Sequence, residues 1–320
     1  MKAIVQDTYG SPDVLEFRDI DRPSPGEGDV LVRVAAAGVD PGVWHLTTGM
    51  PYLLRLMGFG LRTPKVRVRG RDVAGTVEAV GAAVTGFRPG DKVFGISEGT
   101  FAEYTCAPSD RLVVMPSGLS FEEAAAIPIS ALTALQAVRD AGRVTAGQRV
   151  LVIGAAGGVG SFAVQLAKSA GAHVTGVCST GKLDLVRSLG ADEVVDYTCS
   201  GLGSGYDVIL DTAGNRPLSV LRRALTSRGT LVIVGSEGGG RWLGGIDRVL
   251  RASLLSPFVA QRLVGLFSRE RLVDLEFLRS LVDGGSLRVV LDRVFPLASA
   301  GAAVAYVHEG HSAGKVVVAV

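Results

Sequence analysis

The sequence predicts an α/β protein in which a β-rich part is followed by a doubly wound parallel sheet. The chain has 320 residues, more than a single hydrophobic core usually serves, so two domains are expected. Near Phe121 the pattern changes from short strands and turns to apolar strands that alternate with helices. A glycine-rich turn at residues 154–160 joins one of these strands to a helix.

The first part is predicted to be all-β. Short apolar runs bounded by turns predict strands at residues 2–6, 14–18, 30–36, 73–80, 92–94, 101–107 and 112–114. Turn sequences such as Pro23-Ser24-Pro25-Gly26 and Pro89-Gly90-Asp91 separate them. Almost no amphipathic stretch here is long enough to cross between parallel strands, so helical crossovers are not expected.

The second part alternates strands with helices. Strands are predicted at residues 149–153, 174–177, 193–196, 208–211 and 231–234, and helices near 160–170, 181–189 and 217–225. Such alternation indicates a parallel sheet with helices on both faces. From about Leu272 we expect one helix and then short strands that rejoin the first domain.

The glycine turn has the features of a pyrophosphate-binding loop. Residues 150–153 are β-branched and apolar, and the residues after the turn follow helical spacing. Gly157 would let the backbone approach phosphates, and Gly160 would let the helix pack closely on the strand. The first glycine of G-x-G-x-x-G is replaced by Ala155. The alternative is a glycine-rich turn that binds nothing.

Composition excludes several classes of protein. The net charge is +2, which gives no general case for binding nucleic acid or a membrane. The segment after Met1 lacks the apolar stretch of a secretory signal, so a cytoplasmic location is expected. The three cysteines, Cys106, Cys178 and Cys199, are spaced too widely for a zinc knuckle and are interpreted as structural.

Several separated motifs resemble the medium-chain dehydrogenase/reductase superfamily, and within it the zinc-independent quinone oxidoreductases related to zeta-crystallin. The motifs are residues 38–41, 70–77, 84–93, 127–135, 154–160 and 314–317. The resemblance implies a GroES-like catalytic domain, residues 1–123 and 266–320, and a six-stranded Rossmann domain, residues 124–265. It also implies a cofactor bound between the domains and a homodimer joined through the edge strands of the Rossmann sheets.

The positions that bind zinc in related alcohol dehydrogenases do not carry metal ligands here. Asp40 and Arg71-Asp72 replace Cys and His-Glu, and the third ligand falls near Ile129. A catalytic zinc needs about three converging His, Cys or carboxylate ligands, and Arg71 would repel a cation. The four-cysteine lobe is also missing, so no metal is expected.

The residues after the second Rossmann strand favour NADPH over NADH. An acidic residue there would bind the ribose hydroxyls of NAD, but this chain has Cys178, Ser179, Thr180 and Lys182. Two hydroxyls and an ammonium suit a 2′-phosphate. The alternative is that Ser179 and Thr180 only cap the next helix.

The resemblance adds Tyr197 to Lys182 beside the adenosine phosphate. Asp211 is equally well explained as a turn-capping carboxylate or as a cofactor contact. The remaining cofactor residues are expected to be Thr133, Ala156, Gly157, Gly158, Val159, Gly160, Thr212, Ala213, Gly214, Gly235, Ser236 and Lys315.

Three residues near the end of the first domain's third strand are candidate catalytic groups. Tyr52 is the candidate proton donor, although it stands one residue later than in related enoyl reductases. His45 is a second candidate, with a packed or surface role as the alternative. Asp40 stands where the family usually has Asn, and it either contacts the nicotinamide carboxamide or is a solvated loop residue. Thr47 and Thr48 are further donors, and water is the alternative proton source.

Lys65, Arg67, Arg69 and Arg71 recur at every second position and would line one face of an extended segment. A solvated strand edge explains this pattern, and steering of an anionic substrate is the sharper hypothesis. The sequence thus predicts a zinc-independent, NADPH-dependent reductase of quinones or conjugated C=C bonds with a small-molecule substrate. The alternatives are a reductase of enoyl thioesters or polyketide intermediates, and a non-catalytic NADPH-binding protein.

Overall fold

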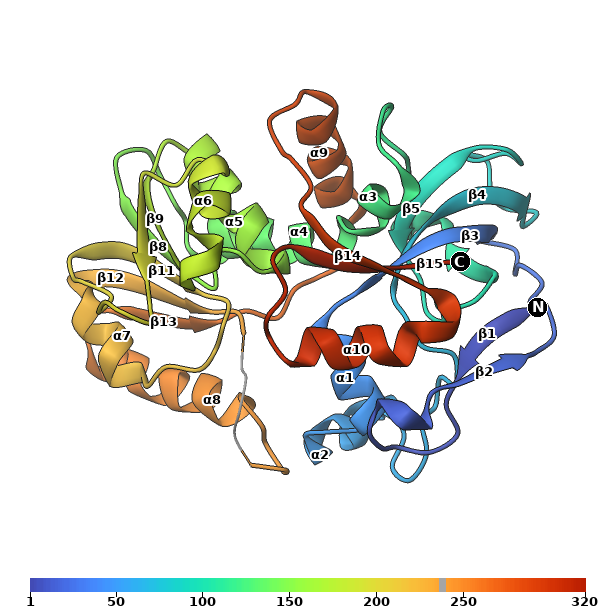
Figure 1. Ribbon diagram of the computed structural model, residues 1–320, viewed down its shortest axis with the longest axis horizontal. Helices are drawn as coiled ribbons and strands as arrows, with labels where there is room; N and C mark the ends of the chain where they lie inside the picture. The colour runs from blue at the N-terminus through green and yellow to red at the C-terminus, as the bar shows by residue number, and fades with distance from the viewer. Residues whose placement is uncertain (236–239) are drawn as a thin grey trace. The chain divides into compact units, whose positions relative to one another are not determined.

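The computed structural model describes residues 1–235 and 240–320 (Figure 1). The chain forms two compact units. Unit 1 comprises Met1–Leu132, Glu270–Gly285 and Val289–Val320, and unit 2 comprises Thr133–Arg269 and Ser286–Arg288. The chain therefore passes from unit 1 to unit 2 within one helix, α4 (Pro128–Gln136).

Unit 1 is built on a largely antiparallel sheet that, among the described residues, has seven strands. Its order is β14-β15-β3-β4-β5-β7, and β6 also pairs with β3. A separate antiparallel pair joins β1 and β2. The strands are β1 (Lys2–Val5), β2 (Glu16–Asp19), β3 (Asp29–Val39), β4 (Asp72–Val80), β5 (Lys92–Ile96), β6 (Tyr104–Pro108), β7 (Leu112–Val114), β14 (Leu291–Pro296) and β15 (Lys315–Ala319).

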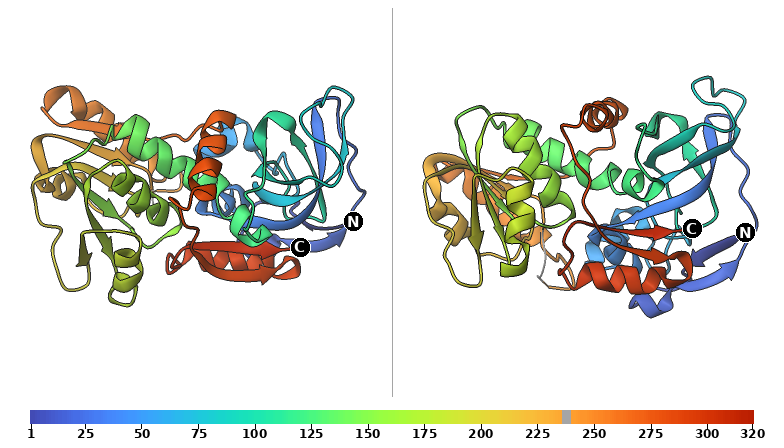
Figure 2. Two further views of the ribbon diagram at one scale, coloured as in Figure 1. Left: turned by 90° about the horizontal axis from the view of Figure 1, so that it is seen from above. Right: turned by 45° about the horizontal axis from the view of Figure 1, so that its top comes forward.

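The C-terminal strands complete the sheet of the first domain, as expected. β15 lies between β14, to which it is parallel, and β3, to which it is antiparallel (Figure 2). The alternating apolar residues of β3 and β4 form the core of this sheet, with Val30, Val32, Val73 and Val77 buried.

Unit 1 contains more helix than the sequence analysis expected. Its helices are α1 (Pro41–Thr48), α2 (Tyr52–Leu54), α3 (Phe121–Ala125), α9 (Leu272–Asp283) and α10 (Ala300–His308), with short helical turns η1 (Pro12–Val14), η2 (Arg55–Phe59), η3 (Ser109–Arg111) and η7 (Leu297–Ser299). The expectations of an all-β first part and of one helix after Leu272 were wrong. α1 forms because Asp40 caps it, Pro41 begins it and Gly49 ends it at φ 63°.

Unit 2 is a doubly wound parallel sheet. Its order is β10-β9-β8-β11-β12-β13, and every pair is parallel. The strands are β8 (Arg149–Ile153), β9 (His173–Cys178), β10 (Glu193–Asp196), β11 (Tyr206–Asp211), β12 (Leu225–Ile233) and β13 (Arg262–Gly265). All five predicted strands are present, and β13 is the one that the sequence analysis missed. The order reverses between β8 and β11, where ligands bind in such sheets.

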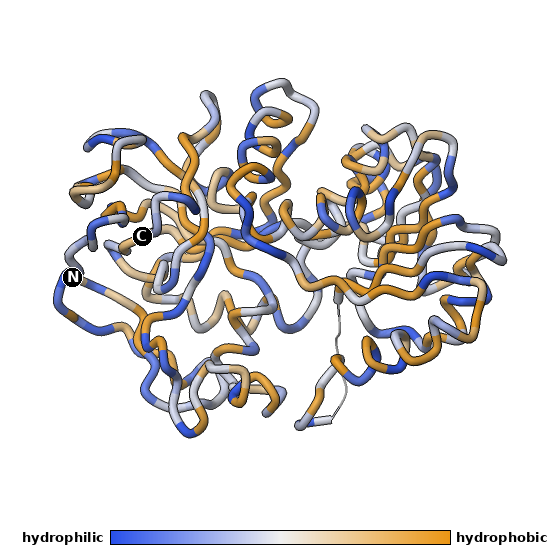
Figure 3. The backbone as a smooth tube through the Cα atoms, turned by 180° about the vertical axis from the view of Figure 1, so that it is seen from behind, coloured by the Kyte–Doolittle hydropathy of each residue, from blue (hydrophilic) through white to orange (hydrophobic). Residues whose placement is uncertain are grey.

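Helices cover both faces of this sheet, α5 (Gly158–Ser169) and α6 (Leu183–Ser188) on one and α7 (Leu218–Ala224) and α8 (Ile246–Leu255) on the other (Figures 1 and 2). Shorter turns are η4 (Ala137–Ala141), η5 (Thr180–Lys182) and η6 (Ser256–Phe258). The strands are largely apolar along their length (Figure 3), as a parallel sheet buried on both faces requires. None of the helices in the described residues is long and apolar enough to cross a membrane.

Candidate functional site

The glycine turn lies between β8 and α5 and leaves the start of α5 open. Gly154 adopts φ 80°, and the amides of Gly154 and Ala155 donate to the carbonyl of Val177 in β9. A Cβ on Gly160 would lie 2.0 Å from the Gly154 carbonyl oxygen, so only glycine allows this helix to approach the strand. No side chain caps α5 at Gly157. The first-turn amides, including those of Gly158, Val159 and Gly160, therefore lie without a side-chain cap at the positive end of the helix, where a negative charge is favoured.

A second group of polar side chains gathers where β9 and β10 end. Cys178 is buried and pairs in register with Asp196. The Thr180 hydroxyl donates to the Asp196 carboxylate, which also accepts from the amide and hydroxyl of Thr198. These bonds lower the pKa of Asp196, the Thr180 bond most. Thr180 is thus held by a carboxylate that the sequence analysis did not connect with it.

The other members of this group are more open. Ser179 and Lys182 are half-buried, and Tyr197 is 52% exposed. Ser179 is the N-cap of the short turn η5 but makes no side-chain cap hydrogen bond, so the capping alternative gains no support at this residue. Lys182 brings a cation to the same edge of the sheet.

The loop after β11 fixes its own geometry. Asp211 is fully buried, and its carboxylate accepts from the Gly214 amide and from Arg248 of α8. Both carboxylate oxygens are thereby engaged, which favours the turn-capping interpretation of Asp211 over a cofactor contact. The Thr212 hydroxyl donates to the Ile153 carbonyl at 2.7 Å.

Two more predicted cofactor residues follow β12. A Cβ on Gly235 would lie 2.1 Å from the Thr212 carbonyl oxygen, so this position requires glycine. Ser236 lies outside the described residues. Thr133 is half-buried on α4, and Ala156 is buried in the glycine turn.

In unit 1, Asp40 presents an unusual carboxylate. One oxygen accepts from the Gly42 amide at 2.8 Å and caps α1. The other, Oδ2, is buried and has no hydrogen-bond partner among the described residues. A buried acceptor without a donor is costly, so this oxygen is poised for a donor from a bound molecule. A nicotinamide carboxamide carries such an N–H donor.

Asp72 and Lys315 form a buried ion pair in the same sheet. The Lys315 ammonium lies 3.3 Å from Asp72 Oδ2, and the Ile129 amide donates to Oδ1 at 2.9 Å. Burial raises the pKa of Asp72 to about 6; Lys315 opposes the rise and the charge of Asp40 adds to it. Lys315 was predicted to contact the cofactor, and its ammonium here contacts Asp72.

His45 and Tyr52 lie on α1 and just after it. His45 Nδ1 lies 2.9 Å from the Met50 carbonyl oxygen. The Arg55 guanidinium stacks 4.8 Å from the Tyr52 ring centroid and donates to the carbonyls of Gly49 and Thr48. These contacts fix Tyr52 relative to the end of α1.

The hydroxyls of Thr47 and Thr48, which were also candidate donors, donate to the carbonyls of Val43 and Trp44 within α1. Their hydroxyl protons are thus engaged in hydrogen bonds within α1. His45 and Tyr52 are the stronger candidates.

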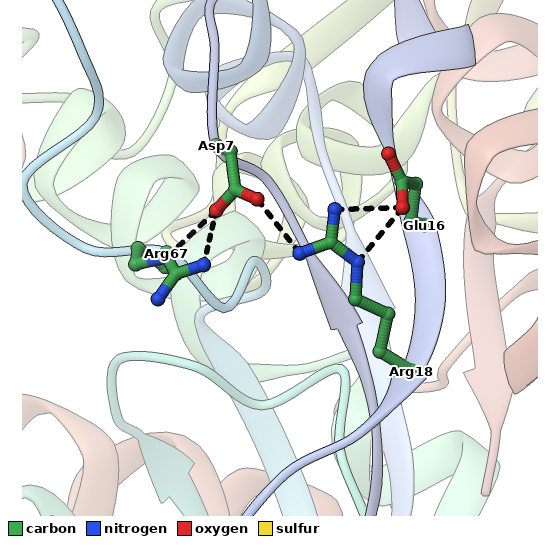
Figure 4. A network of polar contacts seen from close by, with 4 residues as sticks. All are labelled: Asp7, Glu16, Arg18 and Arg67. Atoms are coloured by element: carbon green, nitrogen blue, oxygen red, sulfur yellow. Dashed lines mark hydrogen bonds and ion pairs between the residues drawn. The ribbon is translucent and has the colours of Figure 1, made fainter.

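The basic segment does not form one solvated face. Arg67 pairs with Asp7, which also accepts from Arg18 (Figure 4). Arg71 pairs with Glu270. Arg69 is 4% exposed, and two of its nitrogens have no partner among the described residues. Burial lowers the pKa of Arg69 to about 10.

Two family models match the chain. An alcohol dehydrogenase GroES-like domain matches residues 26–117, and a zinc-binding dehydrogenase model matches residues 189–318. The chloroplast envelope quinone oxidoreductase homolog of Arabidopsis thaliana is 33% identical, over 99% of this chain and 98% of the relative. The chain belongs to the medium-chain dehydrogenase/reductase superfamily, in its quinone oxidoreductase group.

Two further comparisons bear on the chemistry of this oxidoreductase. The 2-methylene-furan-3-one reductase of Solanum lycopersicum is 35% identical over 86% of this chain and 74% of the relative. The solved structure of a mycobacterial protein complexed with NADPH superposes with a TM-score of 0.85 at 27% identity and covers 100% of both chains. The predicted family and fold class are confirmed, and the protein is an enzyme that uses a nicotinamide cofactor.

Within the described parts of the chain, no group of three His, Cys, Asp or Glu side chains is arranged to hold a metal ion. Asp40 caps a helix, Arg71 pairs with Glu270, and Asp72 pairs with Lys315. Each residue at a former zinc-ligand position is thus engaged in a contact of another kind. The donor set present does not fit a catalytic zinc.

Proposed function

We propose that this protein is a zinc-independent reductase that uses NADPH to reduce a quinone or the conjugated C=C bond of an enone. The observation that carries the cofactor preference is the segment after β9. It offers Ser179, Thr180 and Lys182 and no carboxylate between Cys178 and Lys182. Because the Thr180 hydroxyl donates to Asp196, the ammonium of Lys182 and the hydroxyl of Ser179 are the groups that favour a ribose 2′-phosphate over free ribose hydroxyls.

The proposal retains the cofactor-binding roles that the sequence analysis assigned to individual residues. The open first turn of α5 binds the pyrophosphate, with Gly157 giving the backbone room to approach it. A Cβ on Gly157 would meet only the Gly154 carbonyl oxygen, at 3.4 Å, so internal crowding does not explain this glycine. Cys178, Tyr197, Thr212, Ala213, Gly214 and Gly235 are proposed to line the same edge, and Thr133 and Lys315 to support the nicotinamide end.

The bound nicotinamide supplies the hydride, and the protein has to orient the partners and stabilise the developing negative charge. When the cofactor is bound, Asp40 Oδ2 would accept a hydrogen bond from its carboxamide and so help to orient it. Tyr52, held by Arg55, donates a hydrogen bond and then a proton to the anionic oxygen that hydride transfer leaves, that of an enolate or of a hydroquinone monoanion. His45 is the second proposed donor.

A reductase of enoyl thioesters or polyketide intermediates is the second candidate, because a basic loop would attract an anionic carrier. Arg67 is, however, paired with Asp7 and Arg71 with Glu270, and Arg69 is buried. Each of these carboxylates is shared with a second arginine, Asp7 with Arg18 and Glu270 with Arg111. Exposed Arg62 and Lys65 alone give weak steering. The contacts therefore favour an uncharged acceptor.

The partner in solution is proposed to be a second copy of the chain. β13 is the edge strand of unit 2, and nearby Leu250, Leu254 and Phe258 are exposed by 48, 74 and 85%. An unpaired strand edge beside exposed apolar side chains favours self-association. A cytoplasmic location is retained as part of the proposal.

The test is oxidation of NADPH and of NADH against quinones, enones, enoyl thioesters and aldehydes. We expect NADPH to be preferred and quinones or enones to be turned over. Lys182→Glu should raise the KM for NADPH much more than the KM for NADH. Tyr52→Phe should lower turnover of an enone. Equal effects on the two cofactors would reject the NADPH preference, and unchanged turnover in Tyr52→Phe would reject the donor role.

A further inference from the structure

Arg216 links two strand ends that are far apart in the sheet of unit 2. It follows β11, whereas Tyr197 follows β10, and β9 and β8 lie between these strands. Even so, the Arg216 guanidinium carbon lies 6.0 Å from the centroid of the Tyr197 ring. Neighbouring strands are about 4.8 Å apart, so the contact crosses the edge where β8 and β9 end. The nucleotide binds at this edge in the proposed function.

The contact with Tyr197 uses none of the N–H donors of Arg216. A guanidinium that faces an aromatic ring uses its π face, and its N–H groups point outward in the guanidinium plane. Nε of Arg216 is buried and has no hydrogen-bond partner among the described residues. Two parallel N–H donors match the oxygens of a phosphate.

The charged groups near Thr180 also support a role for Arg216 in binding a phosphate. Asp196 places a carboxylate beside Thr180, where a 2′-phosphate would lie. The negative charge of Asp196 offsets part of the attraction that Lys182 exerts on a phosphate dianion. Arg216 supplies the excess positive charge at this edge.

We propose that Arg216 is a specificity-determining residue that binds the 2′-phosphate of the NADP adenosine while it remains next to the Tyr197 ring. The inference rests on the proposed NADPH preference and adds to it a residue from a loop beyond the β9 segment. Arg216 would thus distinguish phosphorylated from unphosphorylated adenosine without touching the nicotinamide.

The test is calorimetric titration of the full chain with 2′,5′-ADP and with 5′-ADP. Arg216→Gln should weaken 2′,5′-ADP binding by about tenfold or more and leave 5′-ADP binding within about twofold, since only the first ligand loses a charge-assisted bond. Arg216→Lys should retain part of the discrimination, because it keeps the charge and loses the paired donors. Retained 5′-ADP binding shows that each variant is folded.

The matched control is Arg228→Gln, an exposed arginine in β12 of the same unit. It should leave both affinities unchanged, which separates a local contact from a general loss of positive charge. Equal weakening of both nucleotides in Arg216→Gln would overturn the inference and indicate stacking on adenine. Discrimination that survives in Arg216→Gln would also overturn it and leave the NADPH preference standing. A wild-type chain that binds both nucleotides equally would reject the inference and the NADPH preference together.

Discussion

The ammonium of Lys315 lies 3.3 Å from the carboxylate of Asp72, and the two residues are 2% and 0% exposed. Lys315 begins β15 and Asp72 begins β4, so the pair joins parts of the chain that are far apart in sequence. Because Asp72 also accepts from the Ile129 amide, it fixes the start of α4 as well. The residues that replace zinc ligands thus take part in the internal bonding of unit 1.

The first prediction concerns the pH dependence of stability. Asp72 has a pKa of about 6 in the folded protein, above its ordinary 3.8, because burial penalises the charged carboxylate. The folded state therefore binds this proton more tightly than the unfolded state does. The stability that the bound proton contributes is lost as the pH rises from about 4 through about 6. As the pH is lowered from about 7 to about 5, the free energy of unfolding of the wild type should rise. The rise should be smaller in Asp72→Asn.

Urea denaturation across that range measures the effect. The pKa values of Asp7 and Asp196 are lowered, so their stabilising effect disappears only at more acidic pH. The difference between wild type and Asp72→Asn isolates residue 72 from other titrating groups. Identical slopes in the two proteins would contradict the prediction.

The second prediction separates the two oxygens of Asp40. Asp40→Ala removes the cap of α1 and should lower the free energy of unfolding by about 1 kcal/mol. Asp40→Asn keeps a capping oxygen and removes a buried charge, so its stability should stay close to that of the wild type. The KM for NADPH should rise in both variants, since both lose the free carboxylate oxygen. Thermal unfolding together with cofactor kinetics checks this, and equal destabilisation by Ala and Asn would argue against the capping role.

The third prediction concerns Gln165, whose side chain makes two hydrogen bonds to the backbone of Arg288. Its amide donates to the Arg288 carbonyl at 2.9 Å, and its carbonyl accepts from the Arg288 amide at 2.8 Å. Gln165→Glu would put a carboxylate oxygen against that carbonyl and should cost about 1–3 kcal/mol. Gln148→Glu is the control, because Gln148 accepts from the Thr145 amide and a carboxylate keeps this bond. Exchange of the Arg288 amide hydrogen should accelerate in Gln165→Glu and not in Gln148→Glu. Protection of this amide that persists in Gln165→Glu would contradict the prediction.

The fourth prediction tests self-association through unit 2. Leu254→Asp with Phe258→Asp should shift the protein from dimer to monomer in sedimentation analysis, because charges beside β13 oppose burial of that edge. Phe277→Asp changes a 44% exposed residue on α9 in unit 1 and should leave the dimer intact. A dimer that survives the double substitution would place the interface elsewhere.

The sequence predicted most of the parallel sheet because the central strands of unit 2, such as β8 and β11, carry runs of buried apolar residues bounded by turns. It missed β13, since Arg262–Gly265 is too short to be told from the apolar stretch around it. It missed α1 because only eight residues form that helix and the cap at Asp40 is its main local signal.

The missed helix also explains why Arg69 does not share the solvated face that the sequence analysis considered for the basic segment. The alternation of Arg67 and Arg69 is real, but α1 covers part of that face, and Arg69 lies near the Leu46 carbonyl. The contacts of Thr180 with Asp196 and of Arg216 with Tyr197 join different strands. No local pattern encodes such pairings, so they required the tertiary structure.

The position of β15 between β14 and β3 has a consequence for synthesis on the ribosome. The last strand of the unit 2 sheet, β13, ends at Gly265. The unit 1 sheet is complete only when residues 315–319 pair with β3. Domains usually fold in the order in which they emerge, N-terminal first. Here the part made first finishes last: residues 29–33 of β3 can pair with β6 early, whereas residues 36–39 stay unpaired along the same edge in the nascent chain until β15 is released.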